Sequence, residues 1–226
     1  MKRTSFIAVL IMGFFGFLCT TSFAMSFNPV SDLSGWEEYQ WTSNPVTITY
    51  TGGRVSFVSD GTNGEAWGKV FTTLPGSTGI MAEVSVSKAT GMGDIGIRKY
   101  IAKTASGNLL LAQIFLEKSA NGYLIYYYLQ ERDSSMNEIR QLGAGVFGDW
   151  GSGTEEWKPG DNVFLGMALV GNEVWFYTPG YDILKKVQIL TPFTPSDGEI
   201  AIYAWTPAGS ANHIEGTVKN VNIIYP

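Results

Sequence analysis

The sequence has almost no cysteine and almost no histidine. Cys19 is the only cysteine among 226 residues, and His213 is the only histidine. One thiol cannot form an intrachain disulfide, and this composition lacks the usual ligands of zinc and copper. It also argues against a catalytic triad, and no Gly-x-Ser-x-Gly elbow is present. His213 lies in a polar stretch, 208–216, and is expected to be an ordinary surface side chain in a loop.

Charged residues are few and scattered. They make up 15% of the chain, with a net charge of −5 and no run of five or more like charges. Nucleic-acid-binding proteins usually carry a basic patch that neutralises phosphates. Nucleic acid is therefore not an expected partner.

Only one long hydrophobic run is present, and it lies at the N-terminus. Lys2 and Arg3 precede the apolar run Phe6–Leu18, and small residues follow as far as Ala24. This order predicts a secretory signal peptide over residues 1–24, cut after Ala24. A retained membrane anchor is the alternative, but a bilayer span takes about 20 apolar residues. We expect a mature chain without cysteine or a membrane span, either secreted or periplasmic.

Glycine and aromatic residues are plentiful: 27 glycines, and 14% Phe, Trp and Tyr. Apolar and polar residues alternate through most of the chain, which is typical of half-buried β-strands. Strands are expected at residues 46–50, 54–58, 66–72, 80–86, 94–102, 109–117, 123–131, 138–142, 163–170, 173–178, 182–190, 200–205 and 217–225. For residues 182–187 a helical turn is the alternative. The pattern predicts one all-β domain over residues 25–226, a two-sheet antiparallel sandwich.

Three segments resemble a known fold family. Residues 157–161 (WKPGD) precede an apolar strand, residues 171–177 (GNEVWFY) suit a hairpin, and residues 216–223 (GTVKNVNI) come near the end. This order resembles the concanavalin A-like lectin/glucanase jelly rolls, including laminin-G-like domains, over most of residues 32–225. The resemblance implies a closing strand that pairs near the first strand. It also implies a curved sheet whose concave face binds sugars or peptides in relatives.

The central strands carry residues suited to sugar binding. Aromatic rings stack on the apolar face of a pyranose, while amides and guanidinium groups meet its hydroxyls. Alternation places Tyr126 and Tyr128 on one face of their strand and Tyr127 on the core face. The predicted polar-aromatic binding surface consists of Arg98, Tyr100, Gln113, Tyr126, Tyr128, Arg140 and Trp150. An ordinary outward sheet face would also carry such residues.

The tryptophans have separate expected roles. Residues 143–161 form the longest stretch without alternation and include Trp150 and Trp157. We expect Trp157 to be packed and Trp150 to lie in a mobile flap over the ligand, because several glycines flank it. Trp175 is expected in the core.

Catalysis and calcium are weaker hypotheses. Glucanase relatives often place carboxylates as Glu-x-Asp-x-x-Glu on one strand, and this run is absent. Glu131 and Glu138 could face each other across a hairpin, but paired surface carboxylates are more often solvated. Loop oxygens of Asp60–Glu65, or Asp32 together with Asn220, could hold calcium, although such residues also form plain turns.

The sequence thus favours an exported, non-catalytic, lectin-like module that binds carbohydrate through a concave sheet face and needs no cofactor, with calcium possible. A structural protein of the cell envelope and a divergent glycan hydrolase or lyase are the alternatives.

Overall fold

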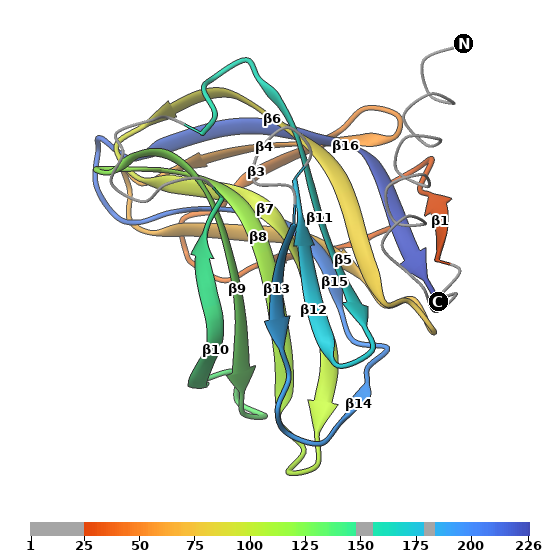
Figure 1. Cartoon of the computed structure of the whole chain (residues 1–226). Coiled ribbons are helices and arrows are strands. Elements are labelled where there is room, and N and C mark those ends of the chain that lie inside the picture. Colours follow the sequence, from red (N-terminus) through yellow and green to blue (C-terminus); the bar gives the residue numbers. More distant parts are fainter. Residues whose placement is uncertain (1–24, 148–155, 179–183) are drawn as a thin grey trace.

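The computed structural model describes residues 25–147, 156–178 and 184–226. These residues contain sixteen β-strands in two antiparallel sheets of eight strands each. The described parts of the chain contain no helix that is long and apolar enough to cross a membrane. The expected all-β jelly-roll sandwich is therefore confirmed (Figure 1).

Sheet A has the order β13-β12-β11-β6-β16-β4-β3, and β1 pairs with the end of β16. Its strands are β1 (Ser26–Pro29), β3 (Thr47–Tyr50), β4 (Arg54–Asp60), β6 (Gly79–Thr90), β11 (Asn162–Val170), β12 (Glu173–Tyr177), β13 (Leu184–Gln188) and β16 (His213–Tyr225). The last strand, β16, thus lies inside the sheet and also pairs with the first strand, as the resemblance implied.

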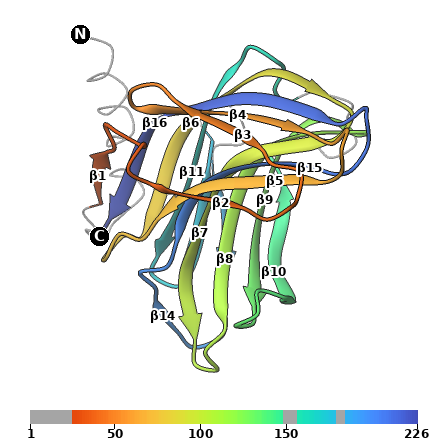
Figure 2. The same cartoon turned by 180° about the vertical axis from the view of Figure 1, so that it is seen from behind.

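Sheet B has the order β10-β9-β8-β7-β15-β5-β2, and β14 pairs with the end of β7. Its strands are β2 (Glu37–Gln40), β5 (Ala66–Thr72), β7 (Gly93–Thr104), β8 (Leu109–Ser119), β9 (Gly122–Arg132), β10 (Glu138–Val146), β14 (Phe193–Pro195) and β15 (Ile200–Thr206). The long strands β7 and β8 arch along their length (Figure 2).

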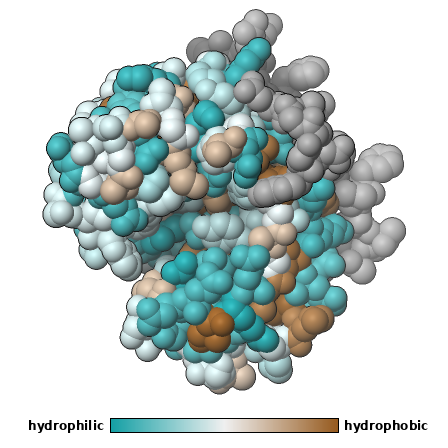
Figure 3. All heavy atoms as spheres, turned by 90° about the vertical axis from the view of Figure 1, so that its left-hand side faces the viewer, coloured by the Kyte–Doolittle hydropathy of each residue, from teal (hydrophilic) through white to brown (hydrophobic). Residues whose placement is uncertain are grey.

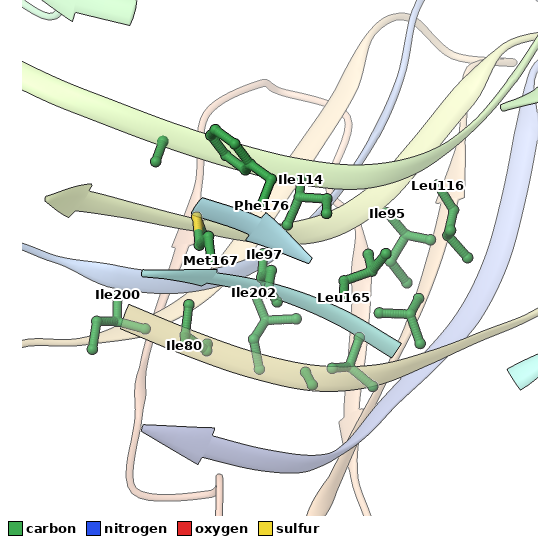
Figure 4. Close-up of a cluster of buried hydrophobic side chains, with 14 of the residues drawn as sticks. Ile80, Ile95, Ile97, Ile114, Leu116, Leu165, Met167, Phe176, Ile200 and Ile202 are labelled. Carbon is green, nitrogen blue, oxygen red and sulfur yellow. The ribbon is translucent and has the colours of Figure 1, made fainter. Parts of the chain in front are cut away.

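The core lies between the sheets and consists mainly of β-branched and aliphatic side chains. Ile95 and Ile97 of β7 and Ile114 of β8 meet Leu165 of β11 and Phe176 of β12 (Figure 4). All five side chains are buried. Alternation along β7 therefore sends Asp94, Gly96, Arg98 and Tyr100, which precede a bulge in this strand, to the opposite face of sheet B. We call this the outer face of sheet B.

The structure decides between the alternatives left open for residues 182–187 and differs from the predicted strands at a few places. Residues 184–188 form the strand β13 and not a helical turn, and β10 continues to Val146 into the expected loop. The short strands β1, β2 and β14 were not predicted. His213 is not in a loop, because β16 begins there and its backbone pairs with β4 and β6.

Candidate binding site

A glycine makes room for a hollow on the outer face of sheet B. Gly96 of β7 lies opposite Phe115 of β8 on one side and Tyr203 of β15 on the other. A Cβ atom at this position would lie 2.4 Å from both the Ile114 carbonyl oxygen and the Phe115 Cβ. The missing side chain thus lets the two aromatic neighbours approach, with ring centroids 6.5 Å apart.

The hollow extends along β7 from Asp94 to Arg98 and encloses about 320 Å³. Its lining combines aromatic and planar polar side chains: Trp41, Glu65, Trp67, Asp94, Arg98, Gln113, Tyr128, Arg132, Tyr203 and Trp205. The four residue steps of extended strand from Asp94 to Arg98 cover about 13 Å, so the hollow is longer than a single sugar ring.

One wall of the hollow is aromatic. Trp67 of β5 stacks on Tyr203, with centroids 6.2 Å apart and an interplanar angle of 23°. Trp41 contacts Trp67 edge-on at 6.0 Å and is 65% exposed. The indole Nε1 of Trp205 donates a hydrogen bond of 2.7 Å to Glu65 Oε1. These contacts fix the rings and leave an indole surface open to solvent.

Arg98 lies at one end of the hollow. Its Nη2 donates to Glu199 Oε1 at 2.9 Å, and its guanidinium lies 4.9 Å from the centroid of Trp67. Lys69 pairs with the other oxygen of Glu199, and burial and the charge of Arg98 lower the pKa of Lys69. The Arg98 Nε is buried and has no hydrogen-bond partner among the described residues. One buried donor in the lining of the hollow is therefore unsatisfied within the described chain.

Asp94 lies at the other end, directly opposite Glu117 of β8 and Trp205 of β15. Its Oδ1 is buried and has no partner in the described chain. Burial, and then the Glu117 carboxylate, raise the pKa of Asp94 well above its usual value, and Tyr203 opposes the shift only in part. Burial also raises the pKa of Glu117. Two carboxyl groups with raised pKa values thus stand side by side on the outer face.

A second hollow, of about 650 Å³, lies beyond Glu117. It is lined by the hairpin residues 91–92 and 118–121 together with Glu117 and Tyr126. Tyr126 stacks on Phe115 at 5.7 Å, and Tyr128 contacts the same ring edge-on. Phe115 therefore joins the aromatic residues of both hollows.

The side of the molecule where β10 forms the edge of sheet B is hollowed and mostly hydrophilic. Figure 3 shows a recess between two lobes on this side. Two strands of the sheet, β9 and β10, lie on the same side in Figure 1.

The structure brings three of the predicted site residues together and separates the others. Arg98, Gln113 and Tyr128 line the first hollow. Tyr126 lies in the second hollow, and Tyr100, although near Arg98, is buried with its hydroxyl 3.6 Å from the sulfur of Met136. The residues predicted to form one binding surface therefore lie in two separate hollows and in a buried position.

Arg140 and Trp150 do not join the first hollow. Arg140 donates to Glu131 at 2.7 Å, and Glu131 is opposite the core residue Leu110 in register. The register of β10 against β9 shifts between Glu138 and Arg140, so side chains do not alternate regularly there. Arg140 therefore lies on the core side of sheet B and not on its outer face. Trp150 lies outside the described residues.

The structure also places Tyr127, Trp157 and Trp175, for which the sequence predicted positions. Tyr127 packs on Phe147 and on Phe176 of the opposite sheet, so the predicted faces of β9 are confirmed. Trp157 is buried, and its Nε1 donates to the Leu124 carbonyl at 2.9 Å. Trp175 is buried as well, but alternation with the core residue Phe176 places it on the outer face of sheet A.

The carboxylates considered for catalysis and for calcium binding already accept hydrogen bonds within the protein. Asn108 and Arg140 donate to Glu131 and lower its pKa, and Gln130 donates to Glu138. These bonds disfavour Glu131 as a proton donor near neutral pH. Asp60 accepts from the Thr62 amide and contacts His213.

Metal sites find little support in the described ranges. They contain no group of three or more His, Cys, Asp and Glu side chains suited to a metal ion. Asn220 donates to Glu83, and Asp32 accepts from the Ser34 amide. Calcium binding stays a prediction from the sequence.

Several residues of the hollow were missed from the sequence. Trp67 and Asp94 lie on predicted strands, and alternation places Asp94 on the same face as Arg98. Tyr203 and Trp205 come from a strand far along the chain. Their place beside β7 depends on the order β7-β15-β5, which connects strands distant in sequence.

Comparisons with known proteins agree on the fold. No protein-family model matches the sequence, and neither does any curated protein. Among solved structures, a β-1,3-1,4-glucanase (lichenase) from a mouse hindgut metagenome is 12% identical, with a TM-score of 0.53 over 90% of this chain and 100% of that one. The carbohydrate recognition domain of Emp47p is 10% identical, with a TM-score of 0.51 over 87% and 94%.

The κ-carrageenase of Zobellia galactanivorans is also 10% identical, with a TM-score of 0.52 over 91% of this chain and 98% of that one. The fold is therefore the concanavalin A-like lectin/glucanase jelly roll, as the sequence resemblance indicated. Identities this low show the fold alone, and the fold does not determine the activity.

Proposed function

We propose that the protein is an exported carbohydrate-binding module whose ligand lies in the hollow between Asp94 and Arg98. The observation that carries the proposal is the lining of this hollow, in which three tryptophans stand beside planar polar groups. Indole rings suit the apolar faces of sugars, and Gln, Asp and Arg side chains suit their hydroxyls. The similar folds of a β-1,3-1,4-glucanase and of a carbohydrate recognition domain support the proposal.

Trp41 adds a second argument. The Trp41 side chain is 65% exposed, so packing against the rest of the protein buries little of its indole ring. Its position edge-on to Trp67 makes a ring surface ready for stacking. The predicted signal peptide places this surface outside the cytoplasm, where glycans of the cell envelope or of the surroundings are available.

The test is a glycan array, followed by affinity electrophoresis of the mature chain in gels that contain the glycans found. Trp41→Ala should abolish retardation and leave the melting temperature nearly unchanged. Tyr39→Ala is the matched control, because Tyr39 is also exposed and contacts Trp67 but does not line the hollow. Absence of any glycan ligand, or equal losses in both variants, would refute the proposal.

A second candidate function is glycan hydrolysis by Asp94 and Glu117. Directly opposite residues on neighbouring strands have Cβ atoms about 5 Å apart, and glycosidases need two carboxyl groups at roughly such a separation. Asp94 would stay protonated and donate to the leaving oxygen, while Glu117 would act as the second carboxylate. Release of reducing sugar that disappears in both Asp94→Asn and Glu117→Gln would establish it.

A further inference from the structure

Two cationic side chains converge on the proposed binding hollow of an otherwise acidic protein. The whole chain has a net charge of −5, yet Arg98 and Arg132 both line this hollow. Arg132 is held by Gln130 and by the Met136 carbonyl, which are neutral acceptors, so no carboxylate in these bonds balances its charge. A guanidinium keeps its charge throughout the ordinary pH range.

Arg98 has only a partial counter-charge. Glu199 accepts from Arg98 and from Lys69 together, so one carboxylate serves two cations. The Arg98 side chain is only 12% exposed, and its buried Nε lacks a partner among the described residues. A buried donor without an acceptor is costly, and an anionic oxygen atom would satisfy it best.

Neither acidic side chain of the hollow forms an ion pair with these arginines among the described residues. Glu65 accepts from Trp205, and Asp94 is buried next to Glu117. The raised pKa of Asp94 favours its neutral form, in which Oδ1 can also donate a hydrogen bond. The Nε of Arg98, unpartnered in the described chain, is a donor, which suits a ligand with acceptor oxygens.

We propose that the hollow binds an anionic polysaccharide, with a carboxylate or sulfate group held by Arg98 and Arg132 and sugar hydroxyls held near Asp94. This inference rests on the proposed carbohydrate binding and adds the charge class of the ligand. The length of the hollow admits more than one sugar unit, so charged and uncharged groups can occupy opposite ends. The aromatic wall of Trp67, Trp41 and Trp205 would stack on the rings between them.

The test uses pairs of polymers that differ in charge. Polygalacturonate is compared with its methyl ester, and κ-carrageenan with its desulfated form, by affinity electrophoresis of the mature chain. The carboxylate pair and the sulfate pair distinguish the two sources of charge. We expect at least one charged polymer to retard the protein and its uncharged counterpart to do so about tenfold less, and the difference to shrink in molar salt.

Variants locate the effect in the hollow. Arg98→Lys keeps a cation for Glu199 but loses the Nε donor, and Arg132→Gln loses one charge. Each should weaken binding about tenfold, the size expected when one charge-assisted hydrogen bond is lost. Arg54→Gln is the control, because Arg54 is an exposed cation of β4 in sheet A and should have no effect. Melting temperatures show whether each variant is folded.

The possible outcomes distinguish binding of an anionic polysaccharide from carbohydrate binding in general. Equal retardation by both members of each pair, or by uncharged polymers alone, would overturn the anionic ligand and leave carbohydrate binding intact. An effect of Arg54→Gln as large as that of Arg98→Lys would also overturn it, because the attraction would then be general. Failure of every glycan on the array and of all four polymers would overturn both.

Discussion

The buried carboxyl group of Asp94 lowers the free energy of unfolding as pH rises. The carboxyl group is buried beside Glu117, and its Oδ1 lacks a partner in the described chain. Its folded-state pKa is raised, so the native protein binds more protons than the unfolded chain above the unfolded pKa of about 3.9. Stability should therefore be fully present below that pH and decline as pH rises through the folded pKa.

The variant Asp94→Asn should remove this decline. Its free energy of unfolding, measured by urea denaturation, should exceed that of the parent at pH 7 and approach it at pH 4. The difference should grow by no more than about 1.4 kcal/mol for each pH unit, the limit for one proton. Asp133→Asn is the control of opposite sign, because bonds from Asn137 and Ser135 lower the pKa of exposed Asp133. An Asp94→Asn variant less stable than the parent at pH 7 would contradict this account.

At the scale of the strand, β9 places Tyr127 in the core and Tyr126 on the outer face of sheet B. Tyr127 contacts Phe147 and Phe176 in the core, whereas Tyr126 stacks on Phe115 at the outer face. Removing a large core side chain costs about 3–5 kcal/mol, and a side chain on an open face costs less. Tyr127→Ala should thus lower the free energy of unfolding much more than Tyr126→Ala.

Urea denaturation of the two variants, with Tyr128→Ala as a third, measures this division. Tyr128 is half-buried in the hollow, and an intermediate loss is expected for it. If Tyr126→Ala destabilised the protein as much as Tyr127→Ala, the outer face would be as important to folding as the core.

The same strand shows what could be predicted from sequence. Alternation assigned the faces of β9, because one face is buried and the other is not. It failed for Arg140, since a bulge changes the register without a mark in the sequence pattern. It could not bring Trp67 and Tyr203 to Arg98, because sequence-distant strands become neighbours only through the topology of sheet B.

At the scale of the whole molecule, the two ends of the chain contribute unequally to sheet A. The C-terminal strand β16 lies between β6 and β4, and Val218, Val221 and Ile223 belong to the core. The N-terminal strand β1 is four residues long and pairs only with residues 222–225 of β16. A cut after Ala24 would leave β1 whole, with one residue before it.

Deletion of each end should therefore have a different result. Removing residues 213–226 deletes the inner strand β16, so β4 and β6 lose the strand that pairs with both of them and the core is exposed. No cooperative unfolding transition should therefore remain. Removing residues 25–30 takes away a peripheral pairing and uncovers Met81 and Ile224, which lie in the small apolar cluster near Phe27. That chain should fold and melt cooperatively at a lower temperature than the mature chain.

Scanning calorimetry and urea denaturation of the two truncated chains measure this difference. Most pairings of sheet A join distant residues, so folding must wait until β16 is available. A cooperative transition in the chain that lacks residues 213–226, near that of the mature protein, would show that sheet A does not depend on β16.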